Sequence, residues 1–445
     1  MLGRVRTAAV RLAALEIWPV ALGVAAGIVS TRALPVTLVA AAIFWPLRWL
    51  AHGRLTVRTP ADWPIGLLLL TLPVTLWATA LPDVTRPQVL RLATGIALYY
   101  AIVNWTTTAG RLRLLGWGLA AAGLLLAVSA PVSVQWIAAG KLTFIPEALY
   151  RRLPTLLSDP IHPNVMAGAL VILLPCALAL PLFAWRELRW YERGLAAAAG
   201  LAMLAVLVLT KSRGGLMGLA AALVILVVLR WRRGWLVTPA GILVAALAIW
   251  RIGIARVAEA LATTQSLGGL DGRLEVWSRA IFMAQDFPFT GIGMGTFRQV
   301  ANAMYPFFLA GPDADVPHAH NLFLQVAVDL GLPGLVAWSA LFLLACTAAW
   351  QLYRCGCALP RSPALPLSHF PTPPLPRSPT RYVIGLAAGL LAGQVALAVH
   401  GLSDAVTWGT RPAVVVWAVW GVAMAMATHS TVHSSEGRGD GERIG

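Results

Sequence analysis

The chain has 445 residues, of which 58% are hydrophobic and 12% are charged. This apolar share exceeds what one soluble core can bury, so a soluble globular protein is not expected and lipid is the predicted solvent. The formal net charge is +16, which in a soluble protein would suggest a nucleic-acid partner. Here the basic residues stand in short clusters between apolar runs, where they set the orientation of a membrane protein. No nucleic-acid partner is therefore expected.

The N-terminus places Arg4, Arg6 and Arg11 before an apolar run, as a signal sequence does. No small-residue cleavage site stands out and further apolar runs follow, so an uncleaved first helix is predicted. Runs of about 20 apolar residues, enough to cross the hydrocarbon of a bilayer, predict an all-α polytopic protein with about twelve membrane-spanning helices. The runs lie near residues 12–30, 33–50, 61–80, 88–105, 112–130, 164–183, 194–210, 214–231, 235–252, 322–350, 382–402 and 411–428.

Arginine clusters alternate with arginine-poor connections along the chain. With the N-terminus inside, clusters such as Arg48, Arg54 and Arg58 fall on the cytoplasmic side. This pattern predicts a multi-pass protein of the bacterial cytoplasmic (inner) membrane with both chain ends inside. The long loops 131–163 and 253–320 then lie outside, and the second of them is predicted to carry short amphipathic helices.

The same orientation divides the chain into parts. Residues 1–163 form an N-terminal transmembrane bundle, and residues 164–350 form a central region that includes the outer loop 253–320. Residues 351–381 form a Pro-rich cytoplasmic linker, and residues 429–445 form a tail that is predicted to be disordered. Residues 382–428 form a C-terminal pair of transmembrane helices. In that pair Gly385, Gly389 and Gly393 recur every four residues, which predicts a helix-packing face.

Ionisable residues at the outer ends of membrane helices are candidate functional residues, because they are costly there. The turn between the predicted spans 194–210 and 214–231 holds Lys211 and Arg213, followed by Gly214 and Gly215. These cations either extend to the interface as ordinary flanking side chains or form an anion site. In the second case the glycines would let backbone N–H groups approach an anion at a helix N-terminus.

A second candidate lies in the outer loop. Asp271 is predicted to cap an amphipathic helix that Pro288 ends, with Glu275 and Arg279 as a supporting ion pair. Arg273 differs, because a cation in the first turn opposes the helix dipole. Its position is better explained if an anion is shared between Arg273 and the helix N-terminus.

The outer loop ends in a third candidate, Pro317-His318-Ala-His320-Asn321. The upstream glycines 291, 293 and 295 have the wrong spacing for a dinucleotide site. His318 and His320 could bind a metal together with Asp313 or Asp315, although no third ligand is convincingly spaced. A neutral imidazole is equally suited to act as a general base. The residues alone leave metal ligand, base and helix cap open.

Several ordered motifs together resemble the O-antigen ligase and Wzy-type polymerase superfamily. They are Lys-Ser-Arg-Gly-Gly (211–215), Gly-Arg-Leu-Glu-Val-Trp (272–277), Phe-Pro-Phe-Thr-Gly-Ile-Gly-Met-Gly-Thr-Phe (287–297), and the long segment from His318 to Leu335. Asp-Pro-Ile-His-Pro-Asn (159–164) also fits the pattern. The similarity covers residues 155–340, so the central region 164–350 is identified as an O-antigen ligase-like catalytic region.

The resemblance implies a metal-independent, inverting membrane glycosyltransferase of the GT-C type that needs no cofactor. It would move a glycan from undecaprenyl pyrophosphate to a glycan or lipid-glycan acceptor, with the active site facing outside and membrane lipid around it. By motif position His320 is the expected base. Arg213 and Arg273 are the expected pyrophosphate ligands, and Lys211 would add positive charge near the phosphates.

Further residues have auxiliary roles in this interpretation. His318 would orient the loop or bind sugar, and Asn321 would cap the helix that follows. His162 would help to bind substrate, as would Asp159, Arg151 and Arg152, although a solvated loop explains these charges equally well. The rival class is a multi-span transporter of small solutes or anions. A transporter should place broken helices and polar residues near the bilayer midplane.

Overall fold

The computed structural model describes residues 2–137, 139–141, 156–157, 159–231, 233–236, 239, 241, 247, 251, 270–309, 311, 315–358 and 380–439. This part of the chain is almost entirely helical, and its extended segments form only the isolated bridge between Val134 and Ile161. The chain is therefore a helical polytopic protein, as its apolar runs predict.

Nine candidate spans in the described part are long and apolar enough to cross a membrane. They comprise α1 (Leu2–Ala13) with α2 (Ile17–Val29), α3 (Ala33–His52), α6 (Ala109–Ser133), α8 (Pro163–Ala184), α9 (Trp190–Leu209), α10 (Arg213–Arg230), α15 (Leu322–Ala358), α16 (Arg381–Gly401) and α17 (Val414–Gly439). The shorter α4 (Asp62–Ala78) and the more polar α5 (Pro82–Trp105) match further predicted runs. The predicted span 235–252 lies almost wholly outside the described residues, so the count of twelve stays a prediction.

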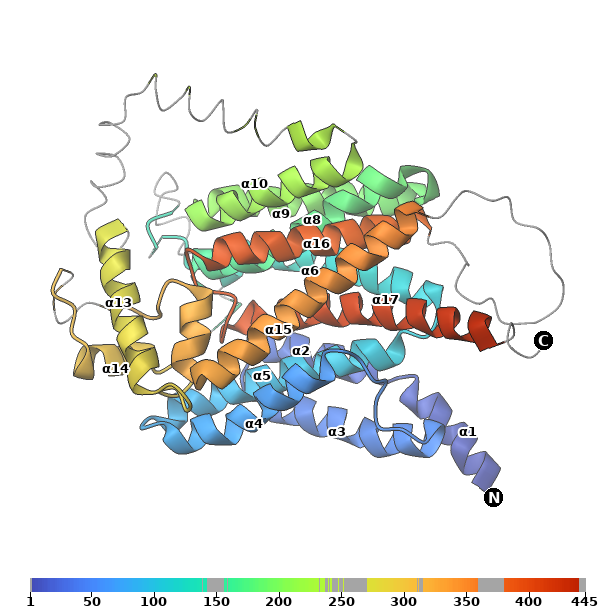
Figure 1. The fold of residues 1–445 in the computed structure, drawn as a ribbon, viewed down its shortest axis with the longest axis horizontal. Coiled ribbons are helices and arrows are strands. Elements are labelled where there is room, and N and C mark those ends of the chain that lie inside the picture. Colours follow the sequence, from blue (N-terminus) through green and yellow to red (C-terminus); the bar gives the residue numbers. More distant parts are fainter. Residues whose placement is uncertain are drawn as a thin grey trace.

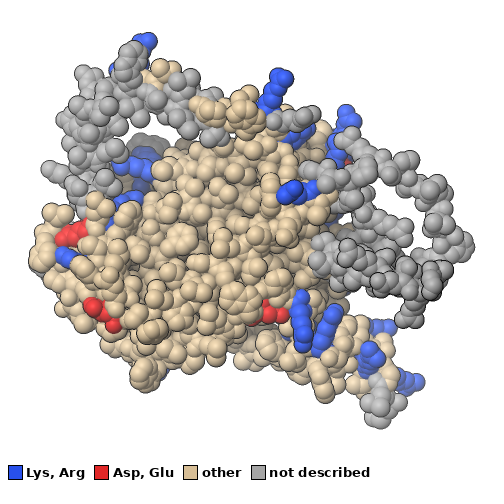
Figure 2. All heavy atoms as spheres, viewed as in Figure 1, with Lys and Arg blue, Asp and Glu red and all other residues tan. Residues whose placement is uncertain are grey.

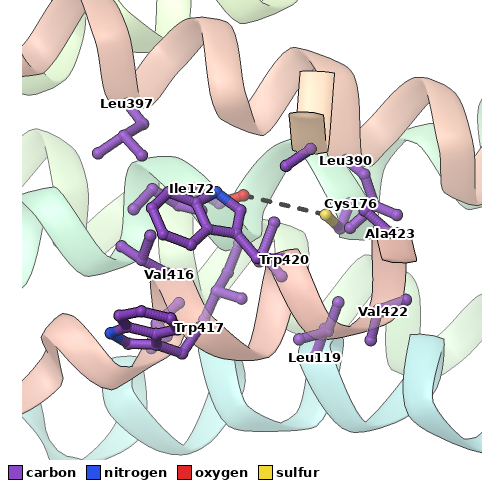
Figure 3. Packing of buried hydrophobic residues seen from close by; sticks show 14 of the residues in the cluster. Leu119, Ile172, Cys176, Leu390, Leu397, Val416, Trp417, Trp420, Val422 and Ala423 are labelled. Carbon is purple, nitrogen blue, oxygen red and sulfur yellow. Dashed lines mark hydrogen bonds between the residues drawn. The ribbon is translucent and has the colours of Figure 1, made fainter. Parts of the chain in front are cut away.

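The central helix α8 is buried along most of its length and packs closely against α16. A Cβ atom built on Gly393 would lie 2.5 Å from the carbonyl oxygen of Ile172, and one on Gly389 would lie 3.1 Å from that of Pro175. Glycine is needed at both positions because α8 backbone occupies that space. The predicted helix-packing face is thus confirmed. Around it α6, α8, α16 and α17 enclose an apolar interior (Figure 3).

The two ends of the helix bundle differ. The N- and C-termini lie at one end, together with the end of α15 and the start of α16 (Figure 1). The amphipathic α13 (Leu270–Asp286) and the short α14 (Phe297–Met304) lie at the other end, which we call the loop end. Lysine and arginine side chains gather towards both ends, and the middle of the visible face shows few charged side chains (Figure 2). This distribution is typical of a membrane-spanning protein.

Two local predictions are wrong. Helix α13 begins at Leu270, so Asp271 lies inside the helix rather than at its N-cap. Helix α17 continues to Gly439, so residues 429–439 are helical where a disordered tail is predicted. In both cases helical backbone hydrogen bonding extends past the boundary that local composition suggests.

The predicted span 322–350 is also not one continuous helix. Gly331 has φ 70° and ψ −174°, which separates a short helix that starts at Leu322 from the long remainder of α15. The backbone groups freed by the break have partners in other segments. The carbonyl oxygen of Val328 accepts from the Ile292 N–H at 2.9 Å, that of Asp329 accepts from the Thr75 hydroxyl at 3.2 Å, and the Leu332 N–H donates to Pro288 at 2.7 Å. The loop after α13 therefore completes the break.

Candidate active site

The His-Ala-His-Asn loop directly precedes α15. The rings of His318 and His320 have centroids 4.4 Å apart. His320 has φ 49°, a left-handed conformation that few residues other than glycine adopt. The side-chain oxygen of Asn321 accepts from the N–H groups of Phe323 at 3.0 Å and Leu324 at 3.1 Å, so the predicted helix cap is confirmed. The cap fixes the end of this strained turn.

Both histidines contact a carboxylate from a distant part of the chain. Asp404, in the loop between α16 and α17, places Oδ1 3.5 Å from His318 Nε2 and 3.6 Å from His320 Nδ1. The Ala405 N–H donates to Oδ1 at 2.9 Å, and the Asn164 side chain donates to Oδ2 at 3.1 Å. Asp404 was missed by the sequence analysis.

The charges of this cluster follow from its burial. Burial lowers the pKa of His318 to about 4, against a smaller opposing effect of the Asp404 charge. Burial would raise the pKa of Asp404. The contact with His320 and the charges of the neighbouring histidines outweigh it, so the pKa of Asp404 falls well below its ordinary value. At neutral pH His318 is therefore uncharged and Asp404 is ionised beside His320.

The segment that opens α8 joins this cluster in part. His162 is the N-cap residue of α8, and its Nδ1 accepts from the Asn164 N–H at 3.2 Å. Burial lowers the pKa of His162, and the Asp404 charge partly offsets this. Asp159 instead contacts Arg411, with Oδ2 3.3 Å from Nη2. Arg151 and Arg152 lie outside the described residues.

The start of α10 brings cations to the loop that carries Asp404. A Cβ atom on Gly214 would lie 2.2 Å from the hydroxyl oxygen of Ser403, which directly precedes Asp404. The side chains of Lys211 and Arg213 are exposed and have no ion-pair or hydrogen-bond partner within the described part of the chain. Both lie close to Lys141, whose pKa is lowered by burial and then by their charges. Positive charge thus accumulates here, and neither Lys211 nor Arg213 forms an ion pair with a carboxylate of the described residues.

Arg273 is a further unpaired cation. It lies partly buried in α13, without an ion-pair or hydrogen-bond partner among the residues that the structure describes. Its charge acts on His400, near the end of α16, whose buried ring nitrogens have no hydrogen-bond partner within the described ranges. The predicted pair of Glu275 and Arg279 is confirmed at 3.8 Å. Arg273 therefore stands apart from the structural ion pair of its own helix.

The glycines of the outer loop have a structural role. Gly291, Gly293 and Gly295 have φ values of 64°, 104° and 77°. A Cβ atom on Gly291 would lie 2.5 Å from the carbonyl carbon of Asp329, and one on Gly293 would lie 2.5 Å from the Thr79 hydroxyl oxygen. Glycine is thus required for the loop to fit against the break in α15.

Asp329, in the first part of α15, connects the loops of the site through hydrogen bonds. Its carboxylate accepts from the Gln325 side chain at 2.8 Å, from the Trp408 indole at 2.8 Å and from the Gly295 N–H at 3.3 Å. Gln325 in turn accepts from the Ala319 N–H at 2.7 Å. The histidine loop, the glycine loop and the Asp404 loop are therefore held by one buried network, which the sequence analysis also missed.

The cluster has the donor atoms of a metal site. One ligand atom from each of His318, His320 and Asp404 lies within 4.8 Å of the others. Asp315, which was considered as a ligand, pairs with Arg298 at 2.8 Å, and Asp313 lies outside the described residues. The third ligand that sequence spacing did not supply is thus present, and the absence of a metal stays a prediction.

The fold and the cluster define a polytopic helical membrane protein with a polar site at the loop end. Residues 198–339 match the family model described as O-antigen ligase. This range contains the start of α10, α13 and the histidine loop. This match supports the predicted resemblance to the O-antigen ligase and Wzy-type polymerase superfamily over this part of the chain. The family implies a glycosyltransferase-like membrane enzyme of polysaccharide biosynthesis. No curated protein matches the chain.

Proposed function

We propose that this protein transfers a glycan from undecaprenyl pyrophosphate to an acceptor sugar at the outer face of the bacterial cytoplasmic membrane. The observation that carries the proposal is the pairing of His320 with ionised Asp404, beside cations that have no partner among the described residues. A base and an anion site are the two elements that such a transfer requires.

His320 is the proposed general base. Its Nδ1 faces Asp404, which leaves Nε2 to accept the proton of the acceptor hydroxyl. Asp404 touches no reacting atom in this scheme and acts as a positioning residue. Its negative charge holds the imidazole and stabilises the imidazolium that forms when the proton arrives. His318, which is neutral at the same pH, orients the loop.

Arg213, Arg273 and Lys211 are the proposed ligands of the pyrophosphate. As the acceptor oxygen bonds to the anomeric carbon, the bond to the pyrophosphate oxygen breaks and negative charge moves onto the leaving group. Guanidinium groups stabilise that charge through bidentate hydrogen bonds, and the N-terminus of α10 adds its dipole. Direct displacement inverts the anomeric centre. No cofactor is required because the donor is already activated.

The proposed orientation places the loop end outside. It rests on the arginine clusters of the cytoplasmic connections and on the position of both termini at the opposite end of the bundle (Figure 1). The same residues would serve a ligase or a polymerase, since these differ in the acceptor rather than in the chemistry.

A transporter is the second candidate, because α15 is a broken helix and broken helices often form transport sites. The break at Gly331 lies near the start of α15, and the interior farther along the helices is apolar (Figure 3). Solute uptake by proteoliposomes without any glycan transfer would favour this candidate.

Purified variants test the proposed enzyme. His320→Ala should lower transfer from a lipid-pyrophosphate donor by about 10²–10⁴-fold, the usual contribution of a general base. Arg213→Ala should also abolish measurable transfer, whereas the exposed Arg86, which pairs only with Asp83, is a control. Full transfer by His320→Ala would reject the base assignment.

Chelation tests the metal assignment. We expect excess EDTA to leave the rate of transfer unchanged, because the proposed chemistry uses a proton acceptor and guanidinium groups alone. If EDTA stops the reaction and Zn²⁺ or Mg²⁺ restores it, His318, His320 and Asp404 form a catalytic metal site instead.

A further inference from the structure

A pocket with polar lining residues lies next to the proposed active site, where the loop that carries Asp404 continues towards α17. It is lined by Thr407, Trp408, Gly409 and Arg411 from this loop and the short turn after it, and by Gln88 and Arg91 from α5. None of the proposed pyrophosphate ligands lines it. The pocket is therefore separate from the proposed donor site, although one loop contributes to both.

Arg91 is a cation in this pocket without a carboxylate contact among the described residues. Its Nη1 donates to the Gln88 side-chain oxygen at 3.1 Å and to the Gly409 carbonyl at 3.0 Å. Both acceptors are neutral. Its Nε is buried and has no hydrogen-bond partner in the part of the chain that the structure describes. A cation withdrawn from water needs a counter-charge, and an unpaired buried donor needs an acceptor.

Arg411 adds a second cation to the same pocket. Its side chain is 15% exposed and pairs at 3.3 Å with Asp159, whose own side chain is 84% exposed. An exposed carboxylate is well solvated and binds its partner weakly. Among the described residues, Asp159 is the only carboxylate that contacts either guanidinium group, and it contacts Arg411 alone, so the pocket keeps a net positive charge.

Most of the remaining lining residues of the pocket are apolar. Val24, Ile28 and Leu34 from α2 and α3 line one part, and Trp338 and Trp417 line another. Cations beside aliphatic and aromatic walls, at the end of membrane helices, fit a phosphate head group whose lipid chain continues into the bilayer. A free sugar would not need either guanidinium.

We propose that Arg91 and Arg411 bind a phosphate group of a lipid, and that in the transfer reaction this is the phosphate of the acceptor's lipid anchor. The assignment to the acceptor's lipid anchor rests on the proposed function, whereas the binding of a lipid phosphate does not. Trp408 lines the pocket and also donates to Asp329, the residue that connects to the histidine loop through Gln325. An acceptor bound here is thereby held by the same network that holds His320.

Lipid binding tests the pocket apart from catalysis. The full chain with Arg213→Ala and Arg273→Ala, which removes the donor ligands, is examined by native mass spectrometry. It is titrated with dioleoyl phosphatidic acid and with dioleoyl phosphatidylcholine. We expect phosphatidic acid to bind more tightly. Adding Arg91→Gln should weaken that binding by about tenfold or more, the loss expected for a charge-assisted hydrogen bond. The matched control is Arg86→Gln, because Arg86 lies on the same helix but is exposed. This variant should leave the binding of phosphatidic acid unchanged.

A second variant keeps the test decisive if Arg91→Gln folds poorly. Asp159→Asn removes the carboxylate that competes for Arg411 without altering the pocket walls, so phosphatidic acid should bind more tightly to it. Inorganic phosphate that displaces the lipid shows that the phosphate group itself is recognised, and lipid binding that phosphate cannot displace shows that the chain is needed too. The proposal is overturned if Arg91→Gln matches Arg86→Gln, or if Asp159→Asn binds no more tightly.

Kinetics test the acceptor assignment. In the otherwise wild-type enzyme Arg91→Gln should raise the KM for the acceptor and leave the KM for the donor unchanged. A raised donor KM would overturn the acceptor assignment. If the wild type binds phosphatidic acid in an Arg91-dependent way but transfers no glycan, the proposed function fails while the phosphate site stands.

Discussion

His320 holds a left-handed backbone conformation that costs free energy in any residue with a Cβ atom. Neighbouring hydrogen bonds hold it there, because Asn321 caps α15 and Gln325 accepts from the Ala319 N–H. The turn brings both imidazoles to one oxygen of Asp404. Strain that is held this firmly is typical of active sites, and here it orients the candidate base.

The role of the Asp404 charge can be tested with a substitution that keeps the shape of the side chain. Asp404→Asn keeps the size of the side chain but loses the charge that stabilises the imidazolium. We expect kcat for transfer to fall by roughly 10²–10⁴-fold, with little change in the KM for the donor. Steady-state kinetics on the purified variant give both constants. An unchanged kcat would mean that Asp404 only packs the loop.

His318 links the stability of the fold to pH. Its pKa is lowered to about 4 from the ordinary 6.5, so between these values the unfolded chain binds a proton that the folded chain does not. The contribution of His318 to the free energy of unfolding should therefore be greatest above pH 6.5 and fall as the pH is lowered towards 4. His162 contributes in the same direction, whereas Asp404 contributes only below its ordinary value of 3.8.

Thermal unfolding midpoints between about pH 4.5 and 7.5 measure this dependence. In His318→Gln the midpoint should rise less steeply with pH than in the wild type, because the contribution of His318 is lost. Equal slopes in the two proteins would show that His318 is not held neutral by the fold.

At the level of the elements, the break in α15 and the glycine loop form one unit. The break exposes backbone groups that the segment around Ile292 and Pro288 satisfies. The glycine-rich motif, which superficially suggests dinucleotide binding, is thus explained by close contacts, of Gly291 with Asp329 and of Gly293 with Thr79. The position of the histidine loop depends on this contact, because the short first part of α15 follows it directly.

Gly291→Ala tests the unit. Gly291 has φ 64°, and an added Cβ would lie 2.5 Å from the backbone of Asp329. We expect the free energy of unfolding, measured by titration with SDS, to fall by at least about 3 kcal/mol. Gly53 is a matched control, since it has φ 68° but nothing within 4 Å of an added Cβ. Gly53→Ala should cost only about 1 kcal/mol. Equal losses of unfolding free energy in the two variants would mean that the positive φ alone, and not the contact with Asp329, requires glycine at position 291.

The sequence predicts the spans and the motif residues but not how they meet. Apolar runs locate the helices because hydropathy is a local property. Arg213, Arg273, His318 and His320 are visible because their residue types are unusual at helix ends. Asp404 satisfies the same criterion, since it lies between two apolar runs, yet its contact with His320 depends on how α16 packs against α8. The Gly331 break is hidden because the surrounding run stays apolar.

At the level of the whole molecule, charged side chains gather towards two ends of the visible face, and few lie in its middle (Figure 2). The proposed active site and the phosphate pocket both belong to the loop end, whereas the termini belong to the other end (Figure 1). If the loop end faces outside, both substrates reach the enzyme from the same leaflet.

Labelling of single cysteines tests this orientation. In a variant that keeps only Cys355, which lies exposed near the end of α15, a membrane-impermeant maleimide should react only after the cells are opened. With Asp315→Cys as the single cysteine, intact spheroplasts should be labelled at once. The reverse pattern would place the histidine loop in the cytoplasm and contradict the proposed site of transfer.

The loop after α16 also bears on how this enzyme could be divided. Every motif that marks the family lies before residue 340, yet the carboxylate that pairs with His320 arrives from beyond it. A polypeptide that ended after α15 would contain every recognisable signature and still lack half of its charged pair. A separate polypeptide made of α16 and α17 could supply that half, because α16 docks onto α8 through small residues. In the proposed mechanism, catalysis thus requires two segments of the chain, and sequence signatures in one segment alone do not show that both are present.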